Sequence, residues 1–159
     1  YEMRDWNDVI DVNLRGVVHG IQAVYPVMRA QGSGHIVNTA SAAATEGQMG
    51  QAAYSAAKAA IVGMTLTIAR DLSREGIRVN TIQPGIFHTP AMARATPQML
   101  EALGNMVPFP QRLGRAEEYA SMALEIVRNA LSAALSRRRS GRRVISSSTN
   151  CRLAGLSSM

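Results

Sequence analysis

The sequence predicts an α/β fold in which two parallel strands are joined by a crossover helix. Three observations predict it: an amphipathic helix opens the chain, two short apolar runs follow, and a long helical segment separates those runs. A strand, a crossover helix and a next strand of this length form a βαβ unit with parallel pairing. Since an open sheet needs more than two strands for independent stability, we expect the C-terminal half of a doubly wound parallel sheet.

Residues 5–30 are predicted to form the first helix. Its apolar residues recur at helical spacing, at Trp6, Ile10, Leu14, Val17, Ile21, Val24 and Met28. We expect Pro26 to bend this helix or loosen its last turn, and Gly32 to contribute to its end. Asn13 lies on the apolar stripe, and a buried amide requires hydrogen-bond partners. Something polar is therefore expected to face Asn13.

The two short apolar runs, at residues 35–39 and 77–82, are the predicted strands. Residues 41–51 (SAAATEGQMGQ) are small and contain two glycines, which is typical of a loop. The Ala-rich pattern over residues 51–74 predicts a long helix, and Gly76 is placed as its C-terminal stop. The resulting strand, helix and strand complete the βαβ unit.

Residues 86–115 mix prolines and glycines with apolar residues, so we expect a loop with one short helix near 97–104. Long irregular segments inside compact domains are usually functional. A further helix is predicted over residues 116–128. The segment 129–159 is rich in arginine and serine and shows neither a helical nor a strand period, so no packed fold is assigned to it.

Length, charge and cysteine content exclude several classes of protein. The chain has 159 residues and 47% apolar residues, which suits one globular domain. No 18-residue apolar stretch lacks a charge, so we expect no membrane partner. Cys151 is the sole cysteine, which excludes an internal disulfide and a cysteine-based zinc site, and we expect no metal. A reducing compartment follows: the cytoplasm, or the mitochondrial matrix if the protein is eukaryotic.

The net charge of +6 belongs to the end of the chain. Residues 126–159 hold seven arginines and no acidic residue, whereas residues 1–125 hold ten basic residues against all 11 acidic ones. Lys58 is the sole lysine, so this residue type is avoided everywhere else. Arginine runs without an aromatic platform are usually solvated, and we therefore do not expect nucleic acid to be the partner.

Tyr54 and Lys58 are four residues apart near the start of the long predicted helix, so both side chains emerge on one face. A phenol is a poor acid or base at neutral pH, but an ammonium held nearby favours its phenolate form. Tyr54 is therefore a candidate general acid and base. An ordinary surface pair on a helix is the alternative interpretation of the same spacing.

Other polar residues are expected at the same edge of the sheet. Ser41 follows the first strand, and Pro84 and Gly85 follow the second. Ligands of open α/β sheets bind outside the carboxyl ends of the strands. A hydroxyl donor beside an activated phenol suits an oxygen that gains or loses charge, although Ser41 also fits a capping or turn role. The amide of Asn13 is a fourth candidate, with a core amide as its alternative.

The segment HIVNTASAAATEGQMGQAAYSAAKAAIVGMTLTIARDLSREGIRVNTIQPGIFHTP resembles the short-chain dehydrogenase/reductase family. The resemblance extends over about residues 1–128 and includes a PGxxxT turn at residues 84–89. The motifs EGQMGQAAYSAAK, PGIFHTP and VPFPQRLG are most similar to those of the type 2 3-hydroxyacyl-CoA dehydrogenases. The family's catalytic tetrad is matched here by Asn13, Ser41, Tyr54 and Lys58.

The resemblance implies a Rossmann-type fold and an oxidoreductase that transfers hydride between NAD and a secondary alcohol, with 3-hydroxyacyl-CoA as the substrate. It implies that Tyr54 takes the hydroxyl proton, that Lys58 favours the phenolate and holds the nicotinamide ribose, and that Ser41 binds the substrate oxygen. Asn13 would hold a water in the proton relay. A homo-oligomer built on the helices 5–30 and 51–74 is also implied.

The resemblance further assigns cofactor and substrate contacts. The nicotinamide end of NAD would meet the turn after the second strand, and segment 90–110 would close over the acyl chain. Gln48 is a weaker substrate contact than Ser41. The cofactor-binding residues are then Tyr54, Lys58, Pro84, Gly85, Phe87 and Thr89.

Parts of the family pattern do not occur in these 159 residues. The glycine-rich TGxxxGxG turn for the pyrophosphate and the acidic residue for the adenosine ribose are absent. We expect residues 1–128 to be a partial domain without its N-terminal cofactor-binding half. The family's final strand is replaced by the tail 129–159, as a frame-shifted reading or a foreign fusion would produce.

Two alternatives remain open. A 3-oxoacyl-(acyl-carrier-protein) reductase would use the same tetrad in the opposite direction with NADPH, and the residue that selects NAD or NADP lies in the half that this sequence lacks. The other alternative is a catalytically inactive fragment with a basic interaction tail, centred on the arginines between residues 137 and 143.

Overall fold

The computed structural model describes residues 2–129 and has the predicted α/β architecture. Strands β1 (Gly34–Thr39) and β2 (Ile77–Ile82) form a parallel two-stranded sheet. Their register runs from Gly34 opposite Ile77 to Thr39 opposite Ile82. Both strands lie where the apolar runs predicted them, and the helix between them makes the crossover.

The N-terminal helix is continuous but contains an irregular turn. Helix α1 (Met3–Ile10) passes into the π-helical segment η1 (Asp11–Arg15), which continues as α2 (Gly16–Gln31). Pro26 lies inside α2 without ending it, and the helix stops at Gly32, whose φ of 64° is the left-handed conformation that glycine adopts without strain. The π-helical turn around Asn13 has no signal in the apolar periodicity.

The crossover contains one helix more than the sequence predicted. Helix α3 (Ala43–Glu46) lies in the segment expected to be a loop, so that expectation was wrong at these residues. An alanine pair favours helix, and the Ser41 side chain accepts a hydrogen bond from the Ala43 N–H at 3.2 Å, which helps to start the turn. Helix α4 (Ala52–Leu72) and the 3₁₀ turn η2 (Ser73–Glu75) follow.

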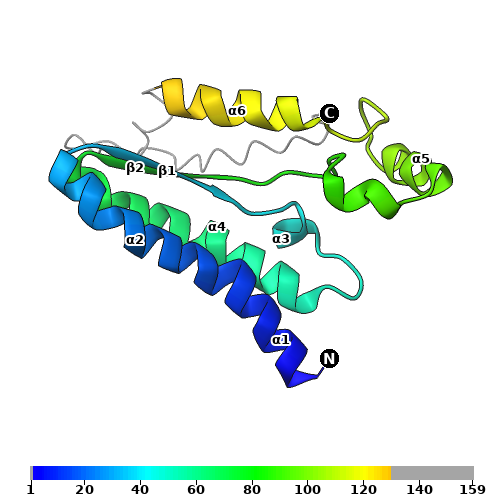
Figure 1. The fold of residues 1–159 in the computed structure, drawn as a ribbon, viewed down its shortest axis with the longest axis horizontal. Coiled ribbons are helices and arrows are strands. Elements are labelled where there is room, and N and C mark those ends of the chain that lie inside the picture. Colours follow the sequence, from blue (N-terminus) through cyan, green and yellow to red (C-terminus); the bar gives the residue numbers. More distant parts are fainter. Residues whose placement is uncertain (1, 130–159) are drawn as a thin grey trace, which may run out of the picture.

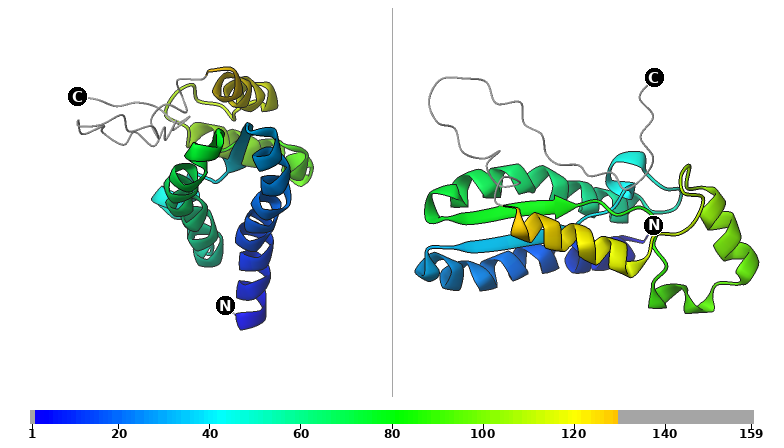
Figure 2. Two further views of the ribbon diagram at one scale, coloured as in Figure 1. Left: turned by 90° about the vertical axis from the view of Figure 1, so that its left-hand side faces the viewer. Right: turned by 90° about the horizontal axis from the view of Figure 1, so that it is seen from above.

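Helices α2 and α4 cover one face of the sheet, as Figures 1 and 2 show. Their apolar side chains pack on a core cluster formed by Ile36, Ala69, Ile77 and Val79, and the partly buried residues against it are Ile21, Tyr25, Met28, Ile68 and Leu72. By length and composition alone, residues 52–75 could cross a membrane. In this fold the same helix instead packs on β2, α3 and the N-terminal helix.

The other face of the sheet carries α6 (Ala116–Arg128), above the strands in Figure 1. The irregular segment before it contains the 3₁₀ turn η3 (Pro90–Arg94) and helix α5 (Pro97–Asn105), which matches the predicted short helix. The Thr96 side chain caps α5 by accepting from the Met99 N–H at 3.2 Å. Residues 130–159, with the arginine cluster and Cys151, lie outside the described residues.

Candidate active site

The candidate site lies at the carboxyl ends of the two strands. Backbone pairing continues beyond them: the Ala40 N–H donates to the Ile82 carbonyl at 2.8 Å, and the Ala42 N–H donates to the Pro84 carbonyl at 2.9 Å. This pairing brings the residue between them, Ser41, alongside the turn after β2. The predicted meeting of Ser41 with the Pro84 corner at one edge of the sheet therefore agrees with the structure.

Tyr54 and Lys58 lie on the first turns of α4, and Lys58 Nζ is 5.5 Å from the centroid of the Tyr54 ring. The ammonium donates a hydrogen bond to the Thr39 carbonyl at 3.1 Å. Burial lowers the pKa of Lys58, because the charged form loses hydration. Lys58 thus connects the Tyr54 ring to the end of β1.

Small side chains on α4 permit this approach. Ala53 and Ala57 are only 1% and 0% exposed, and they face inward from the turns that carry Tyr54 and Lys58. A side chain as small as alanine lets a helix lie close to its neighbours, so the long Lys58 side chain reaches the end of β1. The alanine-rich segment predicted this helix, but not the group that its lysine contacts.

Asn13 lies at the centre of the π-helical segment η1, which packs against α4. Its side chain is half-buried, and Nδ2 donates to the Val9 carbonyl at 3.1 Å. The partner that the sequence required is thus a backbone carbonyl one turn earlier. Single π-helical turns occur frequently at functional sites, because they leave backbone groups out of the regular helical ladder.

The turn after β2 presents the predicted cofactor residues. Phe87 forms an isolated parallel bridge with Gly114, in which the Gly114 N–H donates to the Ile86 carbonyl at 2.9 Å and the His88 N–H donates to the Gly114 carbonyl at 2.8 Å. Gly114 allows this contact, since an added Cβ would lie 2.7 Å from the Phe87 ring. Pro84, Gly85 and Phe87 are half-buried, whereas Thr89 is exposed at the start of η3.

Gln48, the weaker substrate-binding candidate, lies apart from the close contacts described above. It is exposed on the turn between α3 and α4, where its carbonyl accepts the Gln51 N–H at 3.0 Å. Gln48 thus lies just before the start of α4. Its role in substrate binding stays a prediction.

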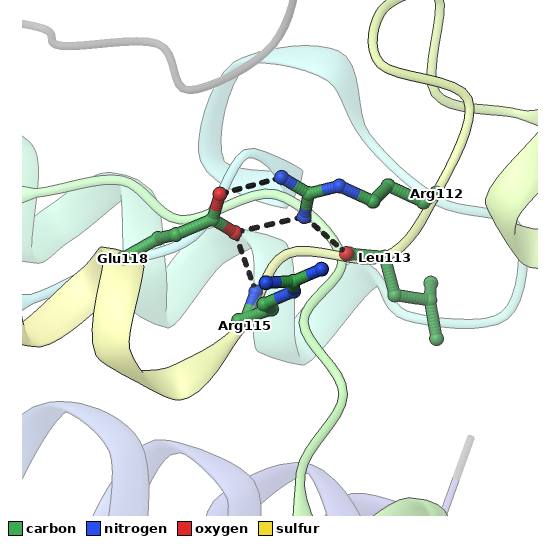
Figure 3. A network of polar contacts seen from close by, with 4 residues as sticks. All are labelled: Arg112, Leu113, Arg115 and Glu118. Carbon is green, nitrogen blue, oxygen red and sulfur yellow. Dashed lines mark hydrogen bonds and ion pairs between the residues drawn. The ribbon is translucent and has the colours of Figure 1, made fainter.

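An ion pair stabilises the segment that supports Phe87. Arg112 donates to both carboxylate oxygens of Glu118, at 2.9 and 2.6 Å, and to the Leu113 carbonyl at 3.0 Å (Figure 3). The Arg115 N–H donates to the same carboxylate at 2.7 Å. Hydrogen bonding from the Arg112 guanidinium, followed by that from the Arg115 N–H, lowers the pKa of Glu118 to about 2. This network joins the loop before α6 to its first turn.

Sequence reasoning missed two residues at the site, Thr39 and Tyr119. The Thr39 carbonyl accepts the Lys58 ammonium, and the Thr39 hydroxyl lies 2.5 Å from the Tyr119 hydroxyl on α6. The Tyr119 ring also meets the Phe87 ring edge to face, with centroids 6.2 Å apart. A threonine in a strand and a tyrosine in an amphipathic helix carry no local signal of such contacts, because their partners are distant in the sequence.

The arrangement places a phenol, an ammonium and a hydroxyl around one end of the sheet. Lys58 has three donors, and only one is used by Thr39, so the others remain for the ribose hydroxyls of a nucleotide. Together with the half-buried turn at residues 84–87, these donors fit the nicotinamide end of a dinucleotide. The glycine-rich TGxxxGxG turn expected for the pyrophosphate does not occur in the sequence of residues 2–129.

Comparison with known proteins places the chain in one family. The family model described as short chain dehydrogenase matches residues 1–100. The 3-hydroxyacyl-CoA dehydrogenase type-2 of Drosophila melanogaster is 47% identical over 137 residues, which are 82% of this chain and 54% of that protein. The chain thus spans about half the length of the curated relatives that it matches.

Two solved structures are similar. The 3-hydroxyacyl-CoA dehydrogenase type-2 from Mycobacterium avium has a TM-score of 0.75 and 42% identity over 78% of this chain and 50% of its own. The 3-oxoacyl-[acyl-carrier protein] reductase from Brucella melitensis also has a TM-score of 0.75, with 34% identity over 84% of this chain and 49% of its own. The chain therefore belongs to the short-chain dehydrogenase/reductase family.

Proposed function

We propose that this chain is the catalytic half of an NAD-dependent dehydrogenase that converts 3-hydroxyacyl-CoA to 3-oxoacyl-CoA. The observation that supports it best is the position of Lys58, held between the Tyr54 ring and the Thr39 carbonyl at the edge where Ser41 follows β1. Relatives named as type-2 3-hydroxyacyl-CoA dehydrogenases supply the substrate class.

Membership of the family implies NAD or NADP as the cofactor. When bound, the nicotinamide would accept the hydride that leaves the carbinol carbon of the substrate. Lys58 would hold its ribose, and Pro84, Gly85, Phe87 and Thr89 would form the wall against which the ring lies. We propose NAD as the physiological cofactor, because the resemblance of the sequence to the type 2 3-hydroxyacyl-CoA dehydrogenases implies it.

In the proposed reaction Tyr54 removes the hydroxyl proton of the substrate. Lys58 stabilises the phenolate by its positive charge, and Ser41 donates a hydrogen bond to the substrate oxygen. Asn13 holds a water that passes the proton to solvent. Gln48 and the segment 90–110 contact the acyl chain, and three exposed apolar side chains in that segment, those of Met99, Met106 and Phe109, suit such a ligand.

A second candidate is an NADPH-dependent 3-oxoacyl-(acyl-carrier-protein) reductase. The similarity to the Brucella melitensis reductase favours it, because that structure covers 84% of this chain at 34% identity. The same tetrad would then donate a proton from Tyr54 to the carbonyl oxygen. Comparing turnover of 3-hydroxyacyl-CoA with that of a 3-oxoacyl-carrier substrate separates the two candidates.

The test is a chimera in which the N-terminal half of the Drosophila melanogaster relative precedes this chain. We expect the chimera to oxidise 3-hydroxyacyl-CoA, and Tyr54→Phe to lower kcat by at least ~100-fold, the scale of positioned acid–base catalysis. Tyr25→Phe is the matched control, since it removes a hydroxyl bonded to Glu75 at the opposite end of the strands. Near-normal turnover by the Tyr54→Phe chimera would contradict the proposal.

We also propose that the enzyme is a homo-oligomer that uses the outer surfaces of α1, α2 and α4. Val12, Val24 and Val27 are 74%, 38% and 58% exposed on the N-terminal helix, and a second copy would cover them. The chimera is expected to sediment as a dimer or tetramer at micromolar concentration. A monomer under the same conditions would exclude this interface.

A further inference from the structure

We propose that Tyr119 is a positioning residue. It holds the end of β1, and with it the Lys58 ammonium, at a fixed position relative to the turn after β2 that carries Phe87. Tyr119 comes from α6, on the face of the sheet opposite α4 (Figures 1 and 2). Tyr119 is outside the expected tetrad, and its hydrogen bond is to Thr39. This proposal rests on the proposed function in one respect, the catalytic role that the proposed function gives to Lys58.

The first step is the contact between two hydroxyls. Tyr119 OH lies 2.5 Å from Thr39 Oγ1, within hydrogen-bond distance, although the residues are 80 positions apart. Thr39 is the last residue of β1, and its carbonyl is the group that accepts the Lys58 ammonium at 3.1 Å. A bond to the Thr39 side chain therefore restricts the residue whose backbone fixes Lys58.

The second step is the contact between two rings. The rings of Tyr119 and Phe87 meet at 88° with centroids 6.2 Å apart, a favoured edge-to-face geometry. Phe87 belongs to the turn after β2. One side chain thus contacts the ends of both strand segments that border the site, through its hydroxyl on one side and its ring on the other.

The third step is the support of Tyr119 itself. Its helix is fixed at the N-terminal end by the pairing of Arg112 with Glu118, the residue before Tyr119 (Figure 3). At the C-terminal end, the Arg78 guanidinium of β2 donates to the carbonyls of Ile126, Val127 and Asn129. A helix held at both ends presents Tyr119 from a constrained position, as a positioning role requires.

The sole lysine makes a direct experiment available. With isotope-labelled lysine, the 159-residue chain has one side-chain ammonium signal in its NMR spectrum, that of Lys58. We expect Tyr119→Phe to raise the hydrogen-exchange rate of those protons by about threefold or more, the scale of one exposed hydrogen bond. This variant keeps the ring contact with Phe87 and loses only the hydroxyl.

Four further variants distinguish positioning from general stability. Thr39→Val should raise the exchange rate of the Lys58 ammonium protons as Tyr119→Phe does, whereas Thr39→Ser, which keeps the hydroxyl, should leave the parental rate unchanged. The double variant Thr39→Val with Tyr119→Phe should exchange no faster than either single variant. Tyr25→Phe, which loses a 3.1 Å bond to Glu75, should leave the Lys58 signal unchanged. Additive effects, or a Lys58 signal unaffected by Tyr119→Phe, would overturn the proposal.

The chimera supplies the second measurement. There Tyr119→Phe should lower kcat by about threefold with little change in the KM for the hydroxyacyl substrate, because the hydroxyl acts on Lys58 and not on the acyl chain. A parental chimera without activity would contradict the proposed function, while the ammonium exchange would still decide the role of Tyr119. Unchanged kcat in an active chimera would count against the positioning role.

Discussion

The two faces of the β1–β2 sheet hold their helices in different ways. On one face α2 and α4 pack through apolar side chains on a cluster that includes Ile36, Ile77 and Val79. On the other face, α6 is joined to the strands by hydrogen bonds near its two ends. Tyr119 of α6 bonds to Thr39 of β1 at one end, and Arg78 of β2 donates to the Val127 carbonyl of α6 at the other. Figure 2 shows the helices on opposite sides of the strands.

This difference indicates that one face of the sheet mainly stabilises the fold, while the other mainly fixes the positions of particular atoms. Burial of apolar area is the dominant favourable contribution to folding, so we expect the α2–α4 face, which holds the buried cluster, to provide more of the stabilisation. Hydrogen bonds depend on distance and angle, so the α6 face contributes less free energy but determines where particular atoms lie. Tyr119, which we propose as a positioning residue, accordingly makes its hydrogen bond on the α6 face.

The largest expected effect is loss of a core side chain. Ile77 is 2% exposed, so Ile77→Ala should lower the free energy of unfolding by about 2–5 kcal/mol, through lost burial and the cavity left behind. Leu124→Ala on α6, where the side chain is 46% exposed, should cost less than about 0.5 kcal/mol. Urea unfolding measures both. Equal costs would show that the two faces are stabilised alike.

The next effect concerns the polar end of α6 at β2. Arg78→Met should destabilise the docking of α6 by about 1–2 kcal/mol, because its last carbonyls lose a charged donor. Amide hydrogen exchange should quicken in α6 and remain unchanged in α4. Arg128→Met, at an exposed arginine of the same helix end, is the control. Equal quickening in both helices would mean that the faces do not respond independently.

A smaller effect is expected from acid at the other end of α6. The folded-state pKa of Glu118 is about 2, and its ordinary value is 4.5. The contribution of the ionised Glu118 carboxylate to folding stability is therefore present above pH 4.5 and is lost as the pH falls towards 2. The Arg115 amide signal in NMR spectra should follow this titration. Glu118→Gln should abolish it, and a midpoint near 4.5 in the parental chain would exclude the ion pair.

The smallest effect concerns His35 on β1. Its Nε2 lies 2.8 Å from Asn80 Oδ1, and burial lowers its pKa from 6.5, although the hydrogen bond with Asn80 opposes the shift. The unfolded chain therefore binds a proton more readily, so stability should be fully present above pH 6.5 and fall as the pH decreases below it. The thermal midpoint should decrease in that range, less so in His35→Gln. His19→Gln, at an exposed histidine, should keep the parental slope.

The sequence predicted the elements well because local patterns encode them. Apolar spacing indicated the N-terminal helix, and the observed helix spans Met3 to Gln31. Gly32 and Gly76 end their helical segments in the left-handed conformation, with φ of 64° and 75°. Helix α3 was missed because a single turn of four residues has too few positions to show a period.

Local patterns also predicted the positions of some residues of the candidate site. The spacing of Tyr54 and Lys58 placed both on one face of a helix, and the parallel strands placed Ser41 and Pro84 at one edge. Gln48 was assigned by resemblance, whereas Asn13 was already a candidate from its place on the apolar stripe and took only its relay role from the resemblance. Both roles stay predictions. The π-helical turn at Asn13 had no sequence signal, because it depends on how the helix packs against α4.

The sequence by itself determined the order of helices and strands, the glycine stops and the shared face of Tyr54 and Lys58, since these depend on residues within about four positions of one another. Only the tertiary structure decided which groups Lys58, Tyr119 and Arg78 reach. Their partners lie 19, 80 and 49 positions away. Contacts of that separation exist only after helices from both faces have docked on the sheet, because docking sets the distances on which a hydrogen bond depends.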